Sequence, residues 1–196
     1  EFALHKYDIR WFLKELAMSE AYQRSSRSKE SQKSTIGDYS QAWERPLSAE
    51  QLCPSVMIAT GQQDLGMVPY SDEVSEELQK EYQEHLKRFQ AAYANIPRDP
   101  EVDFRPSVKA SLFLMNDPHT IEWFAPEKNS YLGELAKLND EDLCLRLYRQ
   151  ALSRNPSQEE QANVLNLLEN SKLPRERVVG HLVWSLVASA EFSLNH

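Results

Sequence analysis

Apolar residues recur at three- and four-residue steps along most of the chain, the spacing of one face of an α-helix. The clearest long stretch is 72–95, where polar residues separate the apolar positions Val74, Leu78, Tyr82, Leu86, Phe89 and Tyr93. No segment shows the sustained alternation typical of a strand, and no period suggests a solenoid. The pattern predicts an all-α fold, an irregular bundle of about seven or eight helices.

The first predicted helix begins after Asp8, whose carboxylate is a good N-cap, and we expect it to run to about Arg24. Its apolar stripe is formed by Ile9, Phe12, Leu13, Leu16 and Ala17. The polar segment 25–42 breaks this pattern. We therefore expect a long irregular loop after the first helix.

A second helix is predicted from a capping box formed by Ser48 and Gln51, and it should run to about Thr60. Pro54 lies inside this helical pattern. Proline lacks the N–H that the helix needs, and its ring clashes with the preceding turn. We therefore expect a kink or a break at Pro54.

The second half of the chain carries further start and stop signals. After a Pro-containing connector at 96–106, a helix should begin at Pro106 and stop at Asn116. Asp117 and Pro118 then suit the cap and first position of the next helix. Later, a helix follows the capping box at 157–160, and a last one should run from Pro174 through Ala190.

Charge and cysteine content narrow the function. The net charge of −8 argues against general nucleic-acid binding, which requires clustered cations. No apolar run approaches the roughly 20 residues of a membrane span. Cys53 and Cys144 lack the paired spacing of a zinc site. We interpret them as two buried thiols, with a disulfide as the alternative if the protein is exported.

Known catalytic signatures are missing. The chain has no G-x-S-x-G, no Walker loop, no G-x-G-x-x-G and no H-E-x-x-H, and it lacks the haem-attachment pattern C-x-x-C-H. No two of its five histidines have the i, i+4 spacing of a metal pair on one helix. We therefore assign no cofactor and no metal, and we favour a role other than catalysis.

The most functional-looking local feature is the run Asn116-Asp117-Pro118-His119. An aspartate and a histidine at a helix start could hold a ligand or polarise water. The alternative is structural: Asp117 caps the helix, Pro118 begins it and His119 is exposed. We favour the structural interpretation, and keep Asn116, Asp117 and His119 as candidate binding residues.

Trp123 and Phe124 follow directly and allow two interpretations as well. Aromatic faces suit the rings of sugars, so the pair could line a carbohydrate surface with Trp123 as its binding residue. Rings of this size also bury much area as core anchors. We favour the core.

Several motifs occur in an order that resembles a known family. They are YDIRWFLKEL at 7–16, SEAYQRSS at 19–26, RPLSAEQL at 45–52, SLFLMNDP at 111–118, RLYRQALSRNPS at 146–157 and SAEF at 189–192. This set resembles the planctomycete C-terminal domain of unknown function numbered fifteen fifty-three. Relatives typically have an Arg-rich extended segment where this chain has the acidic helix at 72–95, and they continue a helix at the position of Pro54.

The resemblance implies that the chain is the C-terminal part of an exported bacterial protein, periplasmic or extracellular. Other domains would lie upstream, often including a cytochrome-c-like haem domain. The family has no established activity, so the resemblance implies no catalytic residue. We expect residues 1–196 to form one helical domain whose partners are the upstream domains of the same parent chain.

Three functional hypotheses follow. The first is a non-catalytic helical scaffold or interaction module, which an exposed apolar patch would support. The second is a carbohydrate-binding or carbohydrate-processing accessory domain, with polysaccharide as partner. It requires Trp43 or Trp123 to be exposed beside a carboxylate in a concave site. The third is an electron-transfer accessory that docks a haem domain through its acidic face.

Overall fold

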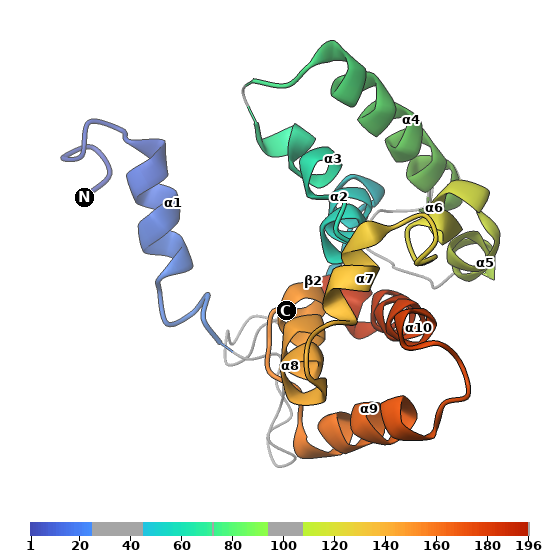
Figure 1. Cartoon of the computed structure of the whole chain (residues 1–196). Helices are drawn as coiled ribbons and strands as arrows, with labels where there is room; N and C mark the ends of the chain where they lie inside the picture. The colour runs from blue at the N-terminus through green and yellow to red at the C-terminus, as the bar shows by residue number, and fades with distance from the viewer. Residues whose placement is uncertain (25–44, 72, 94–107, 196) are drawn as a thin grey trace. The chain divides into compact units, whose positions relative to one another are not determined.

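The structure, a computed structural model, describes residues 1–24, 45–71, 73–93 and 108–195. Its helices are α1 (Ile9–Ala17), α2 (Ala49–Ala59), α3 (Gln63–Met67), α4 (Glu76–Tyr93), α5 (Val108–Asn116), α6 (Pro118–Glu122), α7 (Ser130–Leu135), α8 (Asp140–Leu152), α9 (Gln158–Asn170) and α10 (Arg175–Val187), with the 3-10 turns η1 (Val68–Tyr70) and η2 (Glu191–Ser193) (Figure 1). The strands β1 (Arg45–Pro46) and β2 (Leu194–Asn195) pair in a two-stranded sheet.

The all-α prediction is confirmed, although the described ranges contain ten α-helices rather than seven or eight. The additional helices include α3 and α7, of five and six residues, which are too short to show a periodic apolar pattern. The two-residue strands are likewise too short to alternate. The chain divides into an N-terminal unit, residues 1–45 with 194–196, and a main unit, residues 46–193.

In the N-terminal unit, Asp8 caps α1 as predicted, because its Oδ1 accepts a hydrogen bond from the Trp11 backbone N–H at 3.1 Å. The helix ends at Ala17, so the prediction that it continues to about Arg24 is wrong. Side chains take over carbonyls of its last turn. The Ser19 hydroxyl donates to the carbonyl of Leu16 at 2.7 Å, and the amide of Gln23 donates to that of Ala17 at 2.8 Å. The predicted loop at 25–42 lies outside the described residues.

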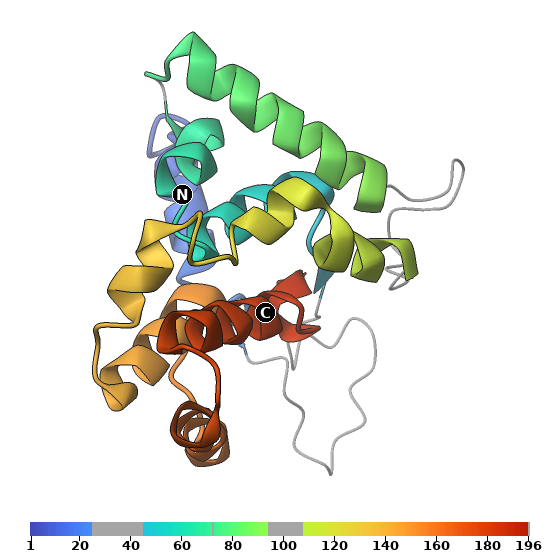
Figure 2. The same cartoon turned by 45° about the vertical axis from the view of Figure 1, so that its right-hand side comes forward.

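In the main unit, α2 contacts α3, α4, α8 and α10, and it runs through the middle of this unit (Figures 1 and 2). The predicted capping box is present, with Gln51 Oε1 accepting from the Ser48 N–H at 3.1 Å. The helix continues through Pro54, so the predicted break does not occur, and the alternative, a kink, stays a prediction. Pro54 and its neighbour Cys53 are buried. Core packing on both sides outweighs the lost hydrogen bond.

Helix α4 is the long acidic helix predicted over 72–95, but it begins later, at Glu76. It begins at Glu76 because Ser75 caps it, with the Ser75 hydroxyl accepting from the Leu78 N–H at 3.3 Å. Tyr82 and Phe89 are buried as the apolar pattern predicts. The predicted connector at 96–106 lies outside the described residues, and α5 begins at 108.

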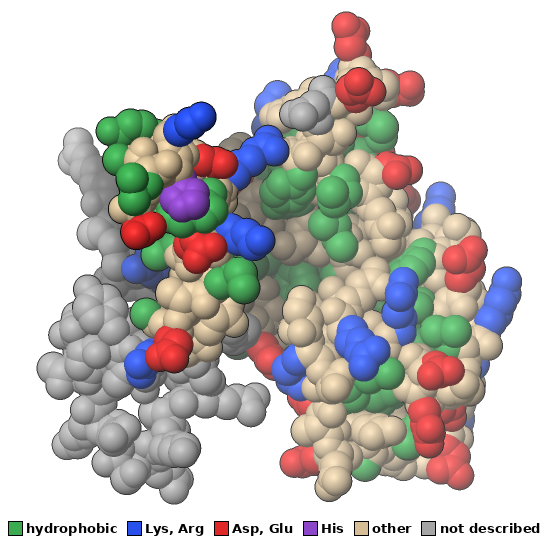
Figure 3. Space-filling model, turned by 90° about the vertical axis from the view of Figure 1, so that its left-hand side faces the viewer, with side chains coloured by type: hydrophobic (Ala, Val, Ile, Leu, Met, Phe, Trp, Pro, Cys, Tyr) green, Lys and Arg blue, Asp and Glu red, His purple; other side chains and the backbone are tan. Residues whose placement is uncertain are grey.

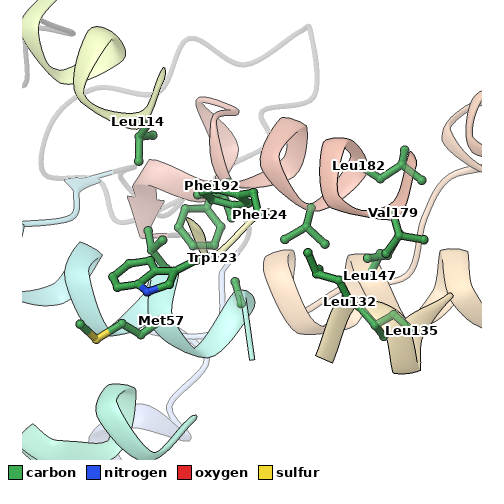
Figure 4. Packing of buried hydrophobic residues seen from close by; sticks show 14 of the residues in the cluster. Met57, Leu114, Trp123, Phe124, Leu132, Leu135, Leu147, Val179, Leu182 and Phe192 are labelled. Atoms are coloured by element: carbon green, nitrogen blue, oxygen red, sulfur yellow. The ribbon is translucent and has the colours of Figure 1, made fainter. Parts of the chain in front are cut away.

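The core joins α2, α4, α7, α8 and α10 with the segment around α6. Figure 4 shows its members from α2, α7, α8 and α10 beside Trp123 and Phe124. Cys53 and Cys144 are both buried free thiols, as predicted. A close approach at Gly180 seats α10, because a Cβ there would lie 2.3 Å from the carbonyl oxygen of Phe124. The capping box of α9 is also confirmed, with Glu160 accepting from the Ser157 N–H at 2.7 Å.

Candidate functional site

Asp117 lies where α5 ends and α6 begins, and it connects both to α4. Its Oδ2 accepts hydrogen bonds from the backbone N–H and the hydroxyl of Thr120, each at 2.9 Å. Its Oδ1 lies 3.2 Å from Nη1 of Arg88 on α4. The structural interpretation of Asp117 as an N-cap is confirmed, with Pro118 at the first helical position.

The surroundings of Asp117 favour the ionised form of its carboxyl group. Burial alone would raise its pKa, but the hydrogen bonds from Thr120 and the positive charge of Arg88 outweigh this effect and hold the pKa below its ordinary value. Both carboxylate oxygens already accept hydrogen bonds or pair with a cation. The Asp117 carboxylate therefore links α4 to α6, and a structural role explains its contacts better than an acid–base role.

The neighbouring polar residues are placed differently. Asn116 is exposed, and its side-chain amide donates to the carbonyl of Leu112 in its own helix at 2.9 Å. His119 is exposed at the surface, as the structural interpretation expects, and its ring lies edge-on to that of His85 with centroids 6.1 Å apart. The fold thus brings His119 and Asp117 beside α4, while Asn116 is engaged with α5.

Trp123 is a core residue, as favoured, because only 7% of it is exposed. Its ring lies 4.9 Å from that of His85 and 6.4 Å from that of Phe89, between centroids. Burial against this surface lowers the pKa of His85. His85 and Arg88 could not be recognised from the sequence as parts of this cluster, because they lie about 30 positions upstream with no motif of their own.

A second polar network, around Arg154, was also missed. Its guanidinium binds the carboxylates of Glu160 and Glu191 at 2.6–2.8 Å, and it lies 5.3 Å from the ring centroid of Tyr148. Hydrogen bonds from Arg154 are the main reason why the pKa of Glu160 falls to about 2. The network ties the turn between α8 and α9 to η2. Only Glu160 had a local signal, through its capping box.

Asn129 is a buried polar residue that orders the centre of the main unit. Its amide donates to the carbonyls of Thr60 and Trp123, each at 2.7 Å, and its Oδ1 accepts from the N–H of Tyr131 at 3.1 Å. Both amide donors and the carbonyl oxygen of the side chain thus contact protein backbone. Asn129 therefore links the end of α2 to the segment after α6, and its role is structural.

Among the hollows on the described part of the main unit, two have mostly apolar walls that include arginine side chains. One, of about 640 Å³, lies between α7 and α8 and includes Arg146 and Arg149. The other, of about 400 Å³, is mostly apolar and has Trp184 in its wall, with the Arg177–Glu127 ion pair at 2.5 Å and His181. Among the residues that the structure describes, no group of three or more His, Cys, Asp or Glu side chains could hold a metal ion.

A family model described as "PSD1: Protein of unknown function (DUF1553)" matches residues 1–168. The chain belongs to this family. The match includes 62–105, where the resemblance rested on no motif, and it stops within α9. The DUF1553 description names no reaction and no ligand. No curated protein and no solved structure matches the chain significantly.

The described part of this DUF1553 chain contains no helix with the length and apolar character needed to cross a membrane. The family motifs do supply parts of both networks above. Asp117 lies in the motif at 111–118, and Arg154 in the motif at 146–157. Asp117 contacts Arg88 of α4, and Arg154 contacts Glu160 of α9 and Glu191 of η2. Both motif residues therefore hold separate elements together.

Proposed function

We propose that the chain is a helical interaction module of an exported, multidomain bacterial protein of planctomycete type, and that it packs against the upstream domains of its own parent chain. The family supports this setting through the resemblance described above. A haem domain is one of the upstream partners that the resemblance implies. The observation that carries the proposal is the apolar stripe of α1.

The stripe, defined as Ile9, Phe12, Leu13 and Leu16, is exposed along its whole length. The exposed fractions of these residues are 65%, 42%, 55% and 47%. No residue of α1 is buried. Figure 3 shows hydrophobic side chains at the surface of the N-terminal unit, mixed with charges of both signs. An amphipathic helix ordinarily buries such a face against another element.

Helix length adds a second reason. α1 has nine residues, fewer than the roughly 12–15 that an isolated helix needs to be more than marginally stable in water. Local contacts help, since the Phe2 ring lies 5.1 Å from Phe12 and His5 stacks on Trp11 at 3.6 Å, between centroids. A partner that covers the stripe would supply the tertiary packing on which short helices depend.

The groups that looked most chemical in the sequence support the same proposal. Asp117, Asn129 and Arg154 each spend their polar atoms on holding helices together. The carbohydrate alternative required Trp123 or Trp43 to be exposed. Trp123 is buried, and Trp43 lies outside the described residues. No observation favours that alternative, and we do not propose it.

The test uses the intact parent protein with a photo-crosslinking phenylalanine analogue in place of Phe12. The matched control carries the analogue at Lys14, an exposed polar position on the opposite face of the same helix. After irradiation, crosslinked peptides are identified by mass spectrometry. We expect position 12 to crosslink to one defined segment upstream of residues 1–196, and position 14 to crosslink there several-fold less.

Two outcomes would overturn the proposal. Crosslinks from position 12 that stay within residues 1–196 would show that the chain covers its own stripe. Equal, scattered crosslinks from positions 12 and 14 would show that the stripe faces solvent in the intact protein.

A further inference from the structure

The hollow beside α7 and α8, here called the α8 hollow, is shaped like a site for a small molecule. Its volume of about 640 Å³ falls within the range of roughly 300–1,000 Å³ typical of ligand sites. It lies in the main unit, where α7 and α8 meet Ile58 of α2 and Gln63 of α3. It shares no residue with the Asp117 cluster and does not depend on the proposed role of α1.

The back of the α8 hollow is fixed by hydrogen bonds. The Tyr131 hydroxyl donates to the side-chain carbonyl of Gln150, whose amide donates to the backbone carbonyl of Ile58 at 2.8 Å. The Tyr131 ring also lies against Gly61, where a Cβ would come within 2.3 Å of it. The wall is therefore built by the fold and stands ready without a ligand.

Two arginines line one side of the α8 hollow. Arg146 and Arg149 are three residues apart on α8, so they share a face of the helix. Within the described ranges, no carboxylate lies within 4.0 Å of either guanidinium. Arg149 is oriented by a hydrogen bond from its Nε to Oδ1 of Asn155 at 2.9 Å, which leaves its terminal nitrogens as donors.

Arg154, farther along the same region, shows what these two arginines lack. It is bound by two carboxylates, and its charge is neutralised inside the protein. Asp142 and Glu134 also line the α8 hollow, but Asp142 is engaged by the side-chain amide of Asn139 at 2.7 Å. The arginine side thus attracts an anion, while the two carboxylates disfavour a multiply charged one.

The remaining wall is apolar. Leucines from α7, α8 and the segment between them line it together with the side chain of Ile58; they are Leu135, Leu138 and Leu145. An anion without an apolar part would leave this surface wet. A ligand with a short apolar body would cover it and gain the free energy of burying apolar area.

We propose that the α8 hollow binds a small organic monoanion, a carboxylate with a short apolar body, with the carboxylate at Arg146 and Arg149 and the body against the leucines. A planar carboxylate matches the fork of guanidinium donors. Arg149 lies in the last turn of α8 and so has a second role, since a cation near a helix C-terminus favours the helix itself. A ligand-binding readout separates the two roles.

The test is an NMR titration of the full chain with hexanoate. Hexylammonium and 1-hexanol serve as matched probes that keep the apolar body and change the head. Hexanoate should cause saturable shifts of the side-chain Nε–H signals of Arg146 and Arg149 and of the methyl signals of Leu135 and Leu138. Hexylammonium should cause none at the arginines. No saturation by hexanoate at its highest soluble concentration would overturn the proposal.

Variants sharpen the test. Arg146→Gln and Arg149→Gln should each weaken hexanoate binding about tenfold, because each removes a charge-assisted hydrogen bond worth about 1.5 kcal/mol or more. Glu134→Gln should strengthen binding a few-fold, an effect that a helix-stabilising role of the arginines does not produce. Arg177→Gln, whose guanidinium pairs with Glu127, is the control and should bind as the native chain does. Unchanged affinity in both α8 variants would overturn the proposal.

Discussion

Helices α1 and α4 carry the same kind of pattern and have opposite fates. Both present apolar residues at helical spacing between charged ones. The 18-residue α4 buries Tyr82, Phe89 and Ala92, whereas no residue of the nine-residue α1 is buried. The difference teaches that an apolar stripe defines which face of a helix needs covering. It does not say whether the cover lies in the same unit.

Replacing one phenylalanine in each helix should give the greatest difference in stability between two variants. Phe89 is fully buried among the rings of Trp123, Tyr93 and Phe113, so Phe89→Ala should lower the free energy of unfolding by about 3–5 kcal/mol. Phe12 is 42% exposed, and Phe12→Ala should change it by no more than about 0.5 kcal/mol. Urea unfolding of the two variants, followed by circular dichroism, measures both.

Two results would contradict this contrast between α1 and α4. A loss above 2 kcal/mol for Phe12→Ala would show that the main fold depends on the α1 stripe within the isolated chain. A loss below about 1 kcal/mol for Phe89→Ala would mean that α4 is not part of the cooperative core. The conservative Phe89→Leu variant should lose less than the alanine variant, because it leaves a smaller cavity.

Replacing the two aspartate caps should give a smaller difference in stability. Asp8 caps α1 alone, whereas Asp117 caps α6 and also pairs with Arg88 on α4. Asp117→Ala should lower the free energy of unfolding by about 1–2 kcal/mol, mostly from the lost cap. The ion pair adds little, because the Arg88 side chain is 42% exposed. Asp8→Ala should leave global unfolding unchanged and only fray α1.

Asparagine separates the two contributions at Asp117. It caps nearly as well as aspartate but carries no charge, so Asp117→Asn should recover most of the stability that alanine loses. If Asp117→Asn is as unstable as Asp117→Ala in thermal melts, the charge pair with Arg88 dominates, and the link between α4 and α6 is stronger than its exposure indicates.

The caps also show what can be predicted from sequence. The caps at Asp8, Ser48, Asp117 and Ser157 were all predicted correctly, because a cap depends on residues within about four positions. The buried state of Trp123 followed from its size and setting. Predictions failed where distant packing decides the outcome. At Pro54, burial keeps α2 continuous where local sterics favour a break.

Most of the polar networks could not be predicted for the same reason. Arg154 and Glu191 are 37 positions apart, and Asn129 reaches Thr60 across 69 positions. Nothing in the local sequence around these residues distinguishes a buried connector from a solvated side chain. The α8 hollow is a further case, since its walls come from residues 58–150 and one of its helices, α7, has too few turns to be seen.

Acid should weaken the contact between α4 and Trp123, and this is the smallest of the predicted changes in stability. The His85 ring packs on Trp123, and burial lowers its pKa below the ordinary value of about 6.5. His119 and Arg88 add to this effect, while Glu81 and Asp117 oppose it. In the unfolded chain His85 binds its proton near pH 6.5, before the folded chain does. Protons therefore favour unfolding, and the free energy of unfolding should fall as the pH drops from about 7.5 to 5.5. The fall should be smaller than the loss expected for Phe89→Ala or Asp117→Ala.

The measurement is the free energy of unfolding from urea titrations at half-unit steps of pH, for the native chain and for His85→Gln. The variant removes the titrating ring, so its stability should vary less with pH across the same window. Aspartate and glutamate carboxyls, whose ordinary pKa values lie near 4, stay ionised there and do not confuse the slope. A variant with the same slope as the native chain would assign the acid sensitivity to another group and leave the α4–Trp123 contact insensitive to pH. A reduced slope would locate the first acid-sensitive contact of the main unit on the face of α4 that is covered.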